Sequence, residues 1–265
     1  MLKMIDIHKT FNAGTVNEKK ALNGLNLTLE KGDFVAVIGG NGAGKSTMLN
    51  ALSGVWPVDK GEIIVDGVNI TKKVEHQRAP YLRRVFQDTM MGTAANMEIQ
   101  ENLALALRRG QKRTLRWGIT EKERREYKEL LATLDLGLEN RMTTKVGLLS
   151  GGQRQALTLL MATLRQPKIL LLDEHTAALD PKTAAKVLEL SDKIISDNGL
   201  TALMVTHNMK DAIKHGNRLI MMNNGQIIFD VKGEEKKNLT VNSLLQKFTE
   251  ISGSEFANDR MLLSE

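Results

Sequence analysis

The feature that most constrains this chain is the stretch 39–47, which reads Gly-Gly-Asn-Gly-Ala-Gly-Lys-Ser-Thr. It satisfies the pattern Gly-x-x-x-x-Gly-Lys-Ser/Thr of a phosphate-binding loop. The apolar run at 34–38 is typical of a buried parallel strand, and residues 48–52 are typical of a helix. A glycine-rich turn that binds no ligand could have the same sequence pattern. A strand, a loop and a helix in this order nevertheless favour nucleotide binding. The sequence therefore predicts an α/β core of the P-loop type.

Each residue type in this loop has a physical task. Glycines let backbone N–H groups face an anion, and the N-terminus of the following helix adds partial positive charge. Lys45 would reach the β- and γ-phosphates of ATP, and the Ser46 hydroxyl would be a ligand of Mg²⁺. The predicted nucleotide contacts in the loop are Gly39, Asn41, Gly42, Gly44, Lys45, Ser46 and Thr47.

Composition excludes several classes of site. The chain has 265 residues and no cysteine, which excludes disulfides, Cys-ligated zinc and iron–sulfur clusters and fits a reducing cytosol. No run approaches the ~20 apolar residues that cross a bilayer, and no secretory signal is visible, so we expect any membrane role to be peripheral. The net charge of +6 either serves solubility or attracts an anionic membrane or nucleic acid. Aromatic residues, at 4%, are too few to favour base-stacking platforms.

A second glycine-rich site lies at 149–153, Leu-Ser-Gly-Gly-Gln, before an apolar helical stripe. Ser150 is a good helix N-cap, and taken alone the stretch could be only a helix start. Like the phosphate loop, it nevertheless combines small residues and unpaired backbone N–H groups with a helix N-terminus, an arrangement that can bind an anion. One nucleotide needs only one such anion-binding site. The second site therefore indicates contact with a nucleotide held by another copy of the chain, which predicts a dimer with ATP at its interface.

Polar side chains follow two further predicted strands. The apolar run 169–172 leads into Asp173 and Glu174, and the run 201–206 leads into His207. Ligands in parallel sheets bind at the carboxyl ends of strands. Asp173 would hold Mg²⁺, and Glu174 would orient or deprotonate the attacking water. Acids that merely cap a strand, and a histidine that is only structural, are the alternatives.

Other stretches leave more open. Residues 2–7, 25–29 and 63–70 indicate an antiparallel layer beside the central sheet. Phe11, expected in a polar loop between the first strands, is either a satellite of the core or a platform for a nucleobase. Gln87 ends a short strand, where a glutamine is usually just solvated.

Helical spacing of leucines extends from 99 to about 138. Within it, 108–117 is strongly basic, either as a solvated face or as a contact to lipid headgroups or a membrane partner. The final residues, 251–265, are expected to be mobile.

Together these motifs make residues 2–250 resemble the ATP-binding subunit of an ATP-binding cassette (ABC) transporter. The most specific element is 149–153, the signature of that family, just upstream of the strand that ends at Asp173. The resemblance implies a RecA-like α/β core, an antiparallel β subdomain and a helical subdomain at about 88–160.

The resemblance also implies roles for single residues. Phe11 matches the aromatic that stacks on adenine. Gln87 matches the residue that senses Mg²⁺ and the attacking water, and His207 matches the contact to the γ-phosphate. Asp180 matches the loop that communicates across the dimer. The residues implied to touch the other subunit's ATP are Ser150 and Gly152.

One position departs from the family pattern. His175 stands where the family usually has proline, so it is expected to alter the stiffness of its loop and the hydrolysis rate without removing a catalytic group. The catalytic residues that the resemblance implies are Glu174, His207, Lys45 and Gln87.

The predicted function is ATP hydrolysis by a head-to-tail homodimer that drives a separate membrane permease. The permease is expected to dock near residues 81–100 and to hold the chain at the cytoplasmic face of the membrane. Import of amino acids or similar small polar solutes, with an extracytoplasmic solute-binding protein and no nucleic acid, fits the likeness to branched-chain amino-acid cassettes. An exporter cassette is the nearest rival, and a non-transport ABC ATPase acting on ribosomes or DNA is a more distant one.

Overall fold

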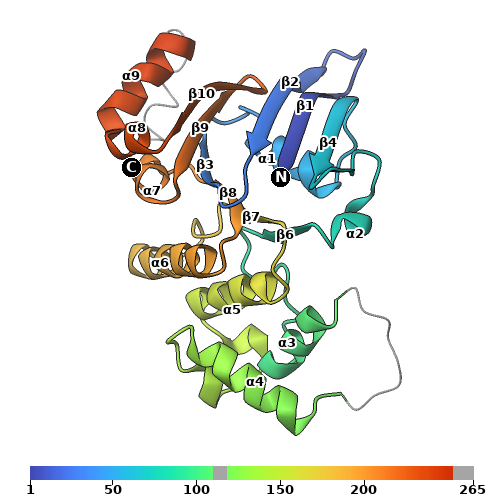
Figure 1. Ribbon diagram of the computed structural model, residues 1–265, viewed down its shortest axis with the longest axis vertical. Coiled ribbons are helices and arrows are strands. Elements are labelled where there is room, and N and C mark those ends of the chain that lie inside the picture. The colour runs from blue at the N-terminus through green and yellow to red at the C-terminus, as the bar shows by residue number, and fades with distance from the viewer. Residues whose placement is uncertain (110–117, 253–265) are drawn as a thin grey trace. The chain divides into compact units, whose positions relative to one another are not determined.

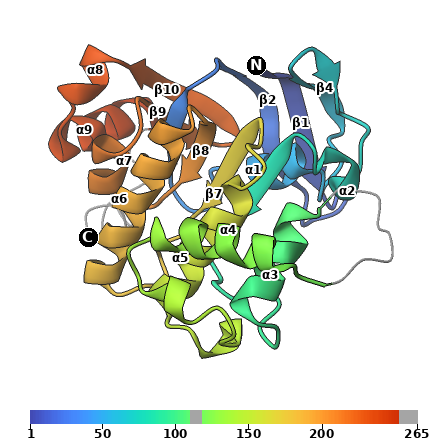
Figure 2. The same cartoon turned by 60° about the horizontal axis from the view of Figure 1, so that its bottom comes forward.

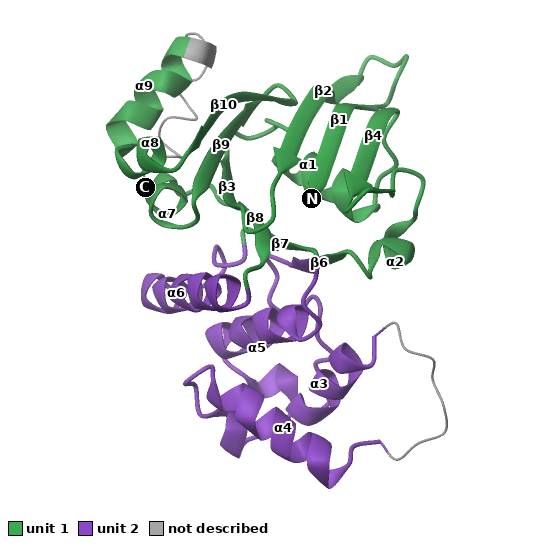
Figure 3. Cartoon of the chain, in the orientation of Figure 1, with its two compact units in different colours: residues 1–82, 168–174, 199–265 green, residues 83–167, 175–198 purple. Residues whose placement is uncertain are grey.

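The computed structural model describes residues 1–109 and 118–252 (Figure 1). They form two compact units, coloured separately in Figure 3. Unit 1 comprises residues 1–82, 168–174 and 199–265, and unit 2 comprises 83–167 and 175–198. The helical segment expected from the sequence, 88–160, falls within unit 2, and its status as a subdomain stays a prediction.

Unit 1 contains two sheets. A four-stranded sheet has the order β2-β1-β4-β5, in which all neighbours are antiparallel. A second sheet has the order β10-β9-β3-β8-β7-β6, and its strands β9, β3, β8 and β7 are parallel. The elements are β1 (Leu2–Phe11), β2 (Lys19–Leu29), β3 (Phe34–Ile38), α1 (Lys45–Ser53), β4 (Lys60–Val65), β5 (Val68–Asn69), α2 (Glu75–Arg78), β7 (Ile169–Asp173), β8 (Thr201–Val205), α7 (Met209–Lys214), β9 (Arg218–Asn223), β10 (Gln226–Lys232), α8 (Glu234–Lys237) and α9 (Val241–Ser252). Of the edge strand β6 (Leu82–Val85), only Leu82 belongs to unit 1, and residues 83–85 belong to unit 2.

The core of unit 1 joins both sheets through α1. Val35 and Val37 of β3 and Leu171 of β7 are fully buried, as expected for parallel strands covered on both faces. Alternate residues of β1 and β2, such as Met4 and Leu27, pack into the same cluster. The predicted α/β core with an antiparallel β layer is therefore confirmed.

Unit 2 is mainly helical. Its elements are α3 (Ile99–Leu107), α4 (Glu121–Ala132), α5 (Gly151–Thr163), α6 (Pro181–Asp197) and the short 3₁₀ helices η1 (Leu138–Asn140) and η2 (Val146–Leu148). Helix α5 lies beside both α3 and α6 (Figures 1 and 2). Buried side chains including Leu103, Tyr127, Leu131 and Leu157 form its core.

The structure differs from the sequence expectations at two places. Phe11 lies in β1, not in a loop, because β1 and β2 stay paired up to Phe11 opposite Lys19. The helical pattern 99–138 is divided into α3 and α4. Thr120 caps α4 through its hydroxyl, which accepts from the Glu123 N–H at 3.2 Å. Most of the basic stretch 108–117 lies outside the described residues. Of the tail 251–265 predicted to be mobile, residues 253–265 lie outside them too, while 251–252 end α9.

The part of the chain that the structure describes contains no helix long and apolar enough to cross a membrane. At the described start of the basic stretch, Arg108 donates to Glu123 at 2.6 Å, and this hydrogen bond raises the pKa of the guanidinium.

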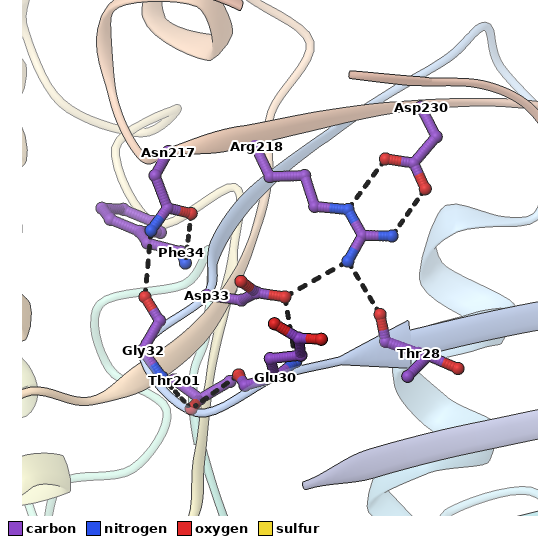
Figure 4. A network of polar contacts seen from close by, with 9 residues as sticks. All are labelled: Thr28, Glu30, Gly32, Asp33, Phe34, Thr201, Asn217, Arg218 and Asp230. Atoms are coloured by element: carbon purple, nitrogen blue, oxygen red, sulfur yellow. Dashed lines mark hydrogen bonds and ion pairs between the residues drawn. The ribbon is translucent and has the colours of Figure 1, made fainter. Parts of the chain in front are cut away.

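An arginine network holds the two sheets of unit 1 together (Figure 4). Arg218 of β9 donates to both carboxylate oxygens of Asp230 on β10, at 2.8 and 2.5 Å. Its third nitrogen donates to the Thr28 carbonyl of β2 at 2.7 Å and to Asp33 at 3.2 Å. The hydrogen bonds to Asp230 raise the pKa of Arg218, so the guanidinium stays charged.

We expect Arg218→Ala to lower the free energy of unfolding by about 2–4 kcal/mol, because the Asp230 and Asp33 carboxylates and the Thr28 carbonyl lose the guanidinium that they share. Chemical denaturation followed by circular dichroism measures the change. Lys31→Ala, at an exposed turn of the same unit, is the control and should change stability by less than about 0.5 kcal/mol. Equal stability of the two variants would show that the network contributes nothing.

Candidate nucleotide site

The phosphate loop leaves the end of β3 and enters α1 at Lys45. Two glycines show why the sequence is so restricted here. Gly39 has φ +150°, and a Cβ on it would lie 2.3 Å from the Met222 carbonyl oxygen. Gly44, the residue before α1, has φ +104°, and its Cβ would lie 2.7 Å from the Ala21 carbonyl oxygen. Neither backbone position tolerates a side chain, so the loop is packed against β9 and β2 as bare backbone.

The β9–β10 hairpin closes the loop from the other side, a contact that the sequence did not predict. The Gly225 N–H donates to the Ala43 carbonyl at 3.0 Å, and the Asn23 N–H donates to the Gly225 carbonyl at 3.1 Å. Gly225 has φ +74°, and a Cβ on it would lie 2.7 Å from the Ala21 oxygen. The β9–β10 turn, the loop and β2 therefore meet backbone to backbone.

The Lys45 side chain is directed into the loop. Its ammonium donates to the carbonyls of Gly39 at 2.5 Å and Gly40 at 3.1 Å, and the residue is 9% exposed. Ser46 is exposed and Thr47 is half-buried beside it. The loop thus gathers an ammonium, a hydroxyl and the first N–H groups of α1, a set suited to an anion with several phosphates.

The far end of α1 is fixed by a buried arginine. Arg78, which is 2% exposed, donates to the carbonyls of Ala51 at 2.7 Å and Leu52 at 2.8 Å. Burial lowers the pKa of Arg78 to about 10, which leaves it charged at neutral pH. A cation at the C-terminus of a helix stabilises the helix, so Arg78 helps hold the phosphate loop in place.

A cavity of about 260 Å³ opens beside the loop. It is lined by Phe11, Lys19, Ala21, residues 41–47 and Glu174. Phe11 packs edge-on against Trp56, with the ring centres 4.9 Å apart. The structure thus places Phe11 with the phosphate loop, as a nucleobase platform requires, although stacking on adenine stays a prediction.

Strand order brings the predicted catalytic residues to the same edge of the sheet. Strand β8 lies between β3 and β7, so the loop after β3, His207 after β8 and Asp173 at the end of β7 share one edge. The Glu174 N–H donates to the Val205 carbonyl at 3.0 Å. Glu174 itself has φ +44°, a left-handed conformation that is uncommon for a residue other than glycine. Such strain is concentrated at functional sites.

Glu174 and His207 face one another. Nδ1 of His207 lies 3.6 Å from a carboxylate oxygen of Glu174, and the side chains are 54% and 25% exposed, respectively. The contact with His207 lowers the pKa of Glu174, although desolvation opposes it. The same contact with Glu174 raises the pKa of His207, again against burial. Glu174 is therefore ionised at neutral pH and can accept a hydrogen bond from a water molecule.

The residues also fit a bound Mg²⁺. Within residues 1–109 and 118–252, no group of three or more His, Cys, Asp or Glu side chains could hold a metal ion by itself. Mg²⁺ takes few protein oxygens and completes its shell with phosphate oxygens and water. The Ser46 hydroxyl and the Asp173 carboxylate, both at the carboxyl edge of the sheet, are donors of that kind.

Unit 2 carries the other predicted residues. Ser150 is the N-cap of α5, where its hydroxyl accepts from the Gln153 N–H at 3.3 Å. Gly152 is buried, and a Cβ on it would lie 2.1 Å from Cγ2 of Thr183, so it lets α5 approach α6 closely. Asp180 caps α6 through the Thr183 N–H at 3.0 Å, and bonding to Thr183 lowers the pKa of Asp180. Each of these residues therefore has a structural task besides the predicted nucleotide contact.

Helix α5, which contains residues 151–153 of the signature, also anchors the segment in which Gln87 lies. Gln155 of α5 donates to the Phe86 carbonyl at 3.2 Å, and Arg154 donates to the Thr89 hydroxyl at 3.2 Å. Gln87 lies between these two anchors and is exposed. The structure thus anchors the segment 86–89, which contains Gln87, on Arg154 and Gln155 of α5, a link that the sequence alone did not indicate.

His175 is 1% exposed in unit 2, and its Nε2 lies 3.0 Å from the Ser191 hydroxyl of α6. That hydroxyl donates to the Val187 carbonyl at 2.8 Å, so the imidazole Nε2–H is the donor to Ser191. A hydrogen bond to α6 thus restrains the loop where the family usually uses a proline ring. Its effect on hydrolysis stays a prediction.

Comparison with known proteins agrees with this site. Residues 22–177 match the family described as ABC transporter. The chain is 45% identical over 248 residues to a tyrosine transport ATP-binding protein of Clostridioides difficile, covering 94% of this chain and 98% of the relative. It is 33% identical over 249 residues to a xylose/arabinose import ATP-binding protein of Sulfolobus acidocaldarius, covering 94% of each.

A solved structure is similar as well. It is the dimeric post-hydrolysis state of the ATP-binding cassette MJ0796 bound to ADP and Pi, with a TM-score of 0.73 and 31% identity over 88% of this chain and 98% of that chain. The fold, the ordered motifs and these relatives agree, and the chain belongs to the ABC transporter family, as an ATP-binding subunit with ATPase activity.

Proposed function

We propose that two copies of this chain associate head to tail and bind two ATP molecules between them. This dimer drives a separate permease that imports an amino acid, with tyrosine as the first candidate. The relative named for tyrosine transport, similar along nearly its whole length, is the observation that carries the choice of solute. The relative named for xylose/arabinose import supports the direction.

In this proposal the residues of unit 1 hold and activate the nucleotide. Lys45 and the loop N–H groups bind the phosphates, and Phe11 stacks on adenine. Bound Mg²⁺, held by Ser46 and Asp173, would neutralise phosphate charge. Glu174 accepts the proton of the attacking water, and His207 contacts the γ-phosphate while orienting Glu174.

The second copy completes each site in this proposal. Ser150 and Gly152 of one copy would contact the triphosphate bound by the other, and Asp180 would lie at the joint. The exposed cap of α5, with bare N–H groups at its start, supports this role. The dimeric cassette with ADP and Pi supports the shared arrangement.

The permease contact would lie near residues 81–100, most of which belong to unit 2, and would hold the chain at the cytoplasmic face of the membrane. Met90 and Met91 are 43% and 50% exposed there. Exposed methionines suit adaptable apolar contacts. A solute-binding protein on the other side of the membrane would complete the system, with no role for nucleic acid.

Dimerisation tests the shared site. Glu174→Gln with ATP and Mg²⁺ is expected to elute from size exclusion with the mass of two chains, because unhydrolysed ATP keeps the two copies joined. Adding Ser150→Arg should abolish the dimer, since a bulky cation at the α5 N-terminus blocks the phosphate seat. Light scattering with and without ATP measures the mass. A double variant that still dimerises would contradict the head-to-tail arrangement.

Uptake tests the solute. Cells that lack this chain should lose uptake of labelled tyrosine and regain it with the wild-type chain but not with Glu174→Gln. Uptake that is unchanged for every amino acid supplied would overturn the proposed solute class, while the permease that co-purifies with the chain would still identify the system.

A further inference from the structure

A second lysine lies at the phosphate loop. Lys19 is the first residue of β2, opposite Phe11 of β1, and it lines the same cavity as Phe11 and the loop. A Cβ built on Gly42 would lie 3.2 Å from the Lys19 ammonium. The ammonium therefore rests directly against the backbone of the loop, on the side of Gly42.

Glu174 lines the same cavity, but no contact with a carboxylate holds Lys19 in this place among the described residues. In the ranges 1–109 and 118–252, Lys19 has no hydrogen bond or ion pair to a carboxylate. Its neighbour Glu18 accepts from the Gly14 N–H at 2.8 Å and so serves the β1–β2 turn. Lys45, the other cation of the cavity, lies inside the loop on the carbonyls of Gly39 and Gly40. The outer side of the loop thus carries a positive charge of its own.

We propose that Lys19 is a second cationic contact for the phosphate chain of the bound nucleotide, placed over the loop at Gly42. This inference rests on the proposed ATP binding. A lysine ammonium is a mobile point charge with three donors, and it binds phosphate oxygens without fixed geometry. Lys19 and Lys45 would then bind the nucleotide from two sides, Lys45 from within the loop and Lys19 from the rim of the cavity.

The next residue offers a matched control. Lys20 is also exposed at the start of β2, but successive side chains of a strand point to opposite faces, and Lys20 does not line the cavity. Lys19→Ala and Lys20→Ala remove the same charge one residue apart. Melting temperatures of both variants equal to that of the wild type would show that neither disturbs the fold.

Titration with ATP, ADP and AMP at low and high salt tests the proposal. We expect Lys19→Ala to weaken ATP binding about fivefold at low salt and to flatten its salt dependence, as for loss of one exposed charge contact. AMP binding should change by less than about twofold, since most of the phosphate charge is missing. Lys19→Arg should restore ATP binding, and Lys20→Ala should match the wild type.

Two outcomes separate this inference from the proposed function. If the wild type binds ATP, Lys45→Ala does not, and Lys19→Ala equals Lys20→Ala, then only the role of Lys19 is overturned. An equal loss of AMP and ATP affinity in Lys19→Ala would overturn it too, because the contact would not be to the phosphate chain. If the wild type binds no nucleotide, the proposed function fails and the role of Lys19 fails with it.

Discussion

Glu174→Gln is expected to bind ATP with nearly unchanged affinity and to hydrolyse it at least ~100-fold more slowly, as loss of a general base should do. The amide keeps the shape of the side chain but cannot accept the proton of the attacking water. Glu174 is well placed for the task, because it follows the end of β7 in a left-handed backbone conformation and its carboxylate faces His207, a contact that lowers the pKa of Glu174. Phosphate release under saturating ATP, together with an equilibrium binding titration, measures both properties.

The control for this experiment is Glu62→Gln, which makes the same change at an exposed position of β4. It should leave both binding and turnover unaltered. Near-normal turnover by Glu174→Gln would refute the assignment of the base. Loss of binding together with turnover would point instead to a role of Glu174 in holding the nucleotide.

Lys45→Ala is expected to weaken ATP binding by ~100-fold or more and to abolish measurable hydrolysis. The ammonium of Lys45 is buried within the loop, and charge-assisted hydrogen bonds in such sites are worth about twice those between neutral groups. Calorimetric titration of ATP gives the affinity. Thermal melts give a second reading, since a ligand that binds only the folded state raises the melting temperature.

Lys210→Ala, at an exposed position of α7, provides the comparison for charge alone. Its ATP affinity should equal that of the wild type. The melting temperature of Lys45→Ala without ATP shows whether the fold itself has changed. A folded Lys45→Ala protein with native affinity would exclude the phosphate loop as the nucleotide site.

The catalytic edge of the sheet could be predicted because each of its residues follows an apolar run of its own. The carboxyl ends of parallel strands meet at one edge, so Lys45, Glu174 and His207 were expected together, and unit 1 places them so. The antiparallel layer was predicted for the same reason, from alternation in short segments. These features need only local sequence and a general rule of sheet topology.

Contacts between distant segments could not be predicted in this way. Phe11 was assigned to a loop because nothing in residues 10–14 shows that β1 remains paired with β2 so far. The closeness of Lys19 to Gly42, and of Gln155 to Phe86, depends on how strands and helices pack in three dimensions. Lys19 pairs with Phe11 and Lys20 with Thr10, a register that the sequence alone does not reveal.

The turn between β9 and β10 has a consequence for mutational surveys of such proteins. Gly225 lies outside the nucleotide-binding motifs, yet its backbone is in contact with the phosphate loop and β2, and it has no space for even a methyl group. A substitution at Gly225 would distort the phosphate loop without removing any group that touches the nucleotide. In a screen for inactive variants it would therefore be counted among the nucleotide-binding residues, although its defect lies in steric crowding.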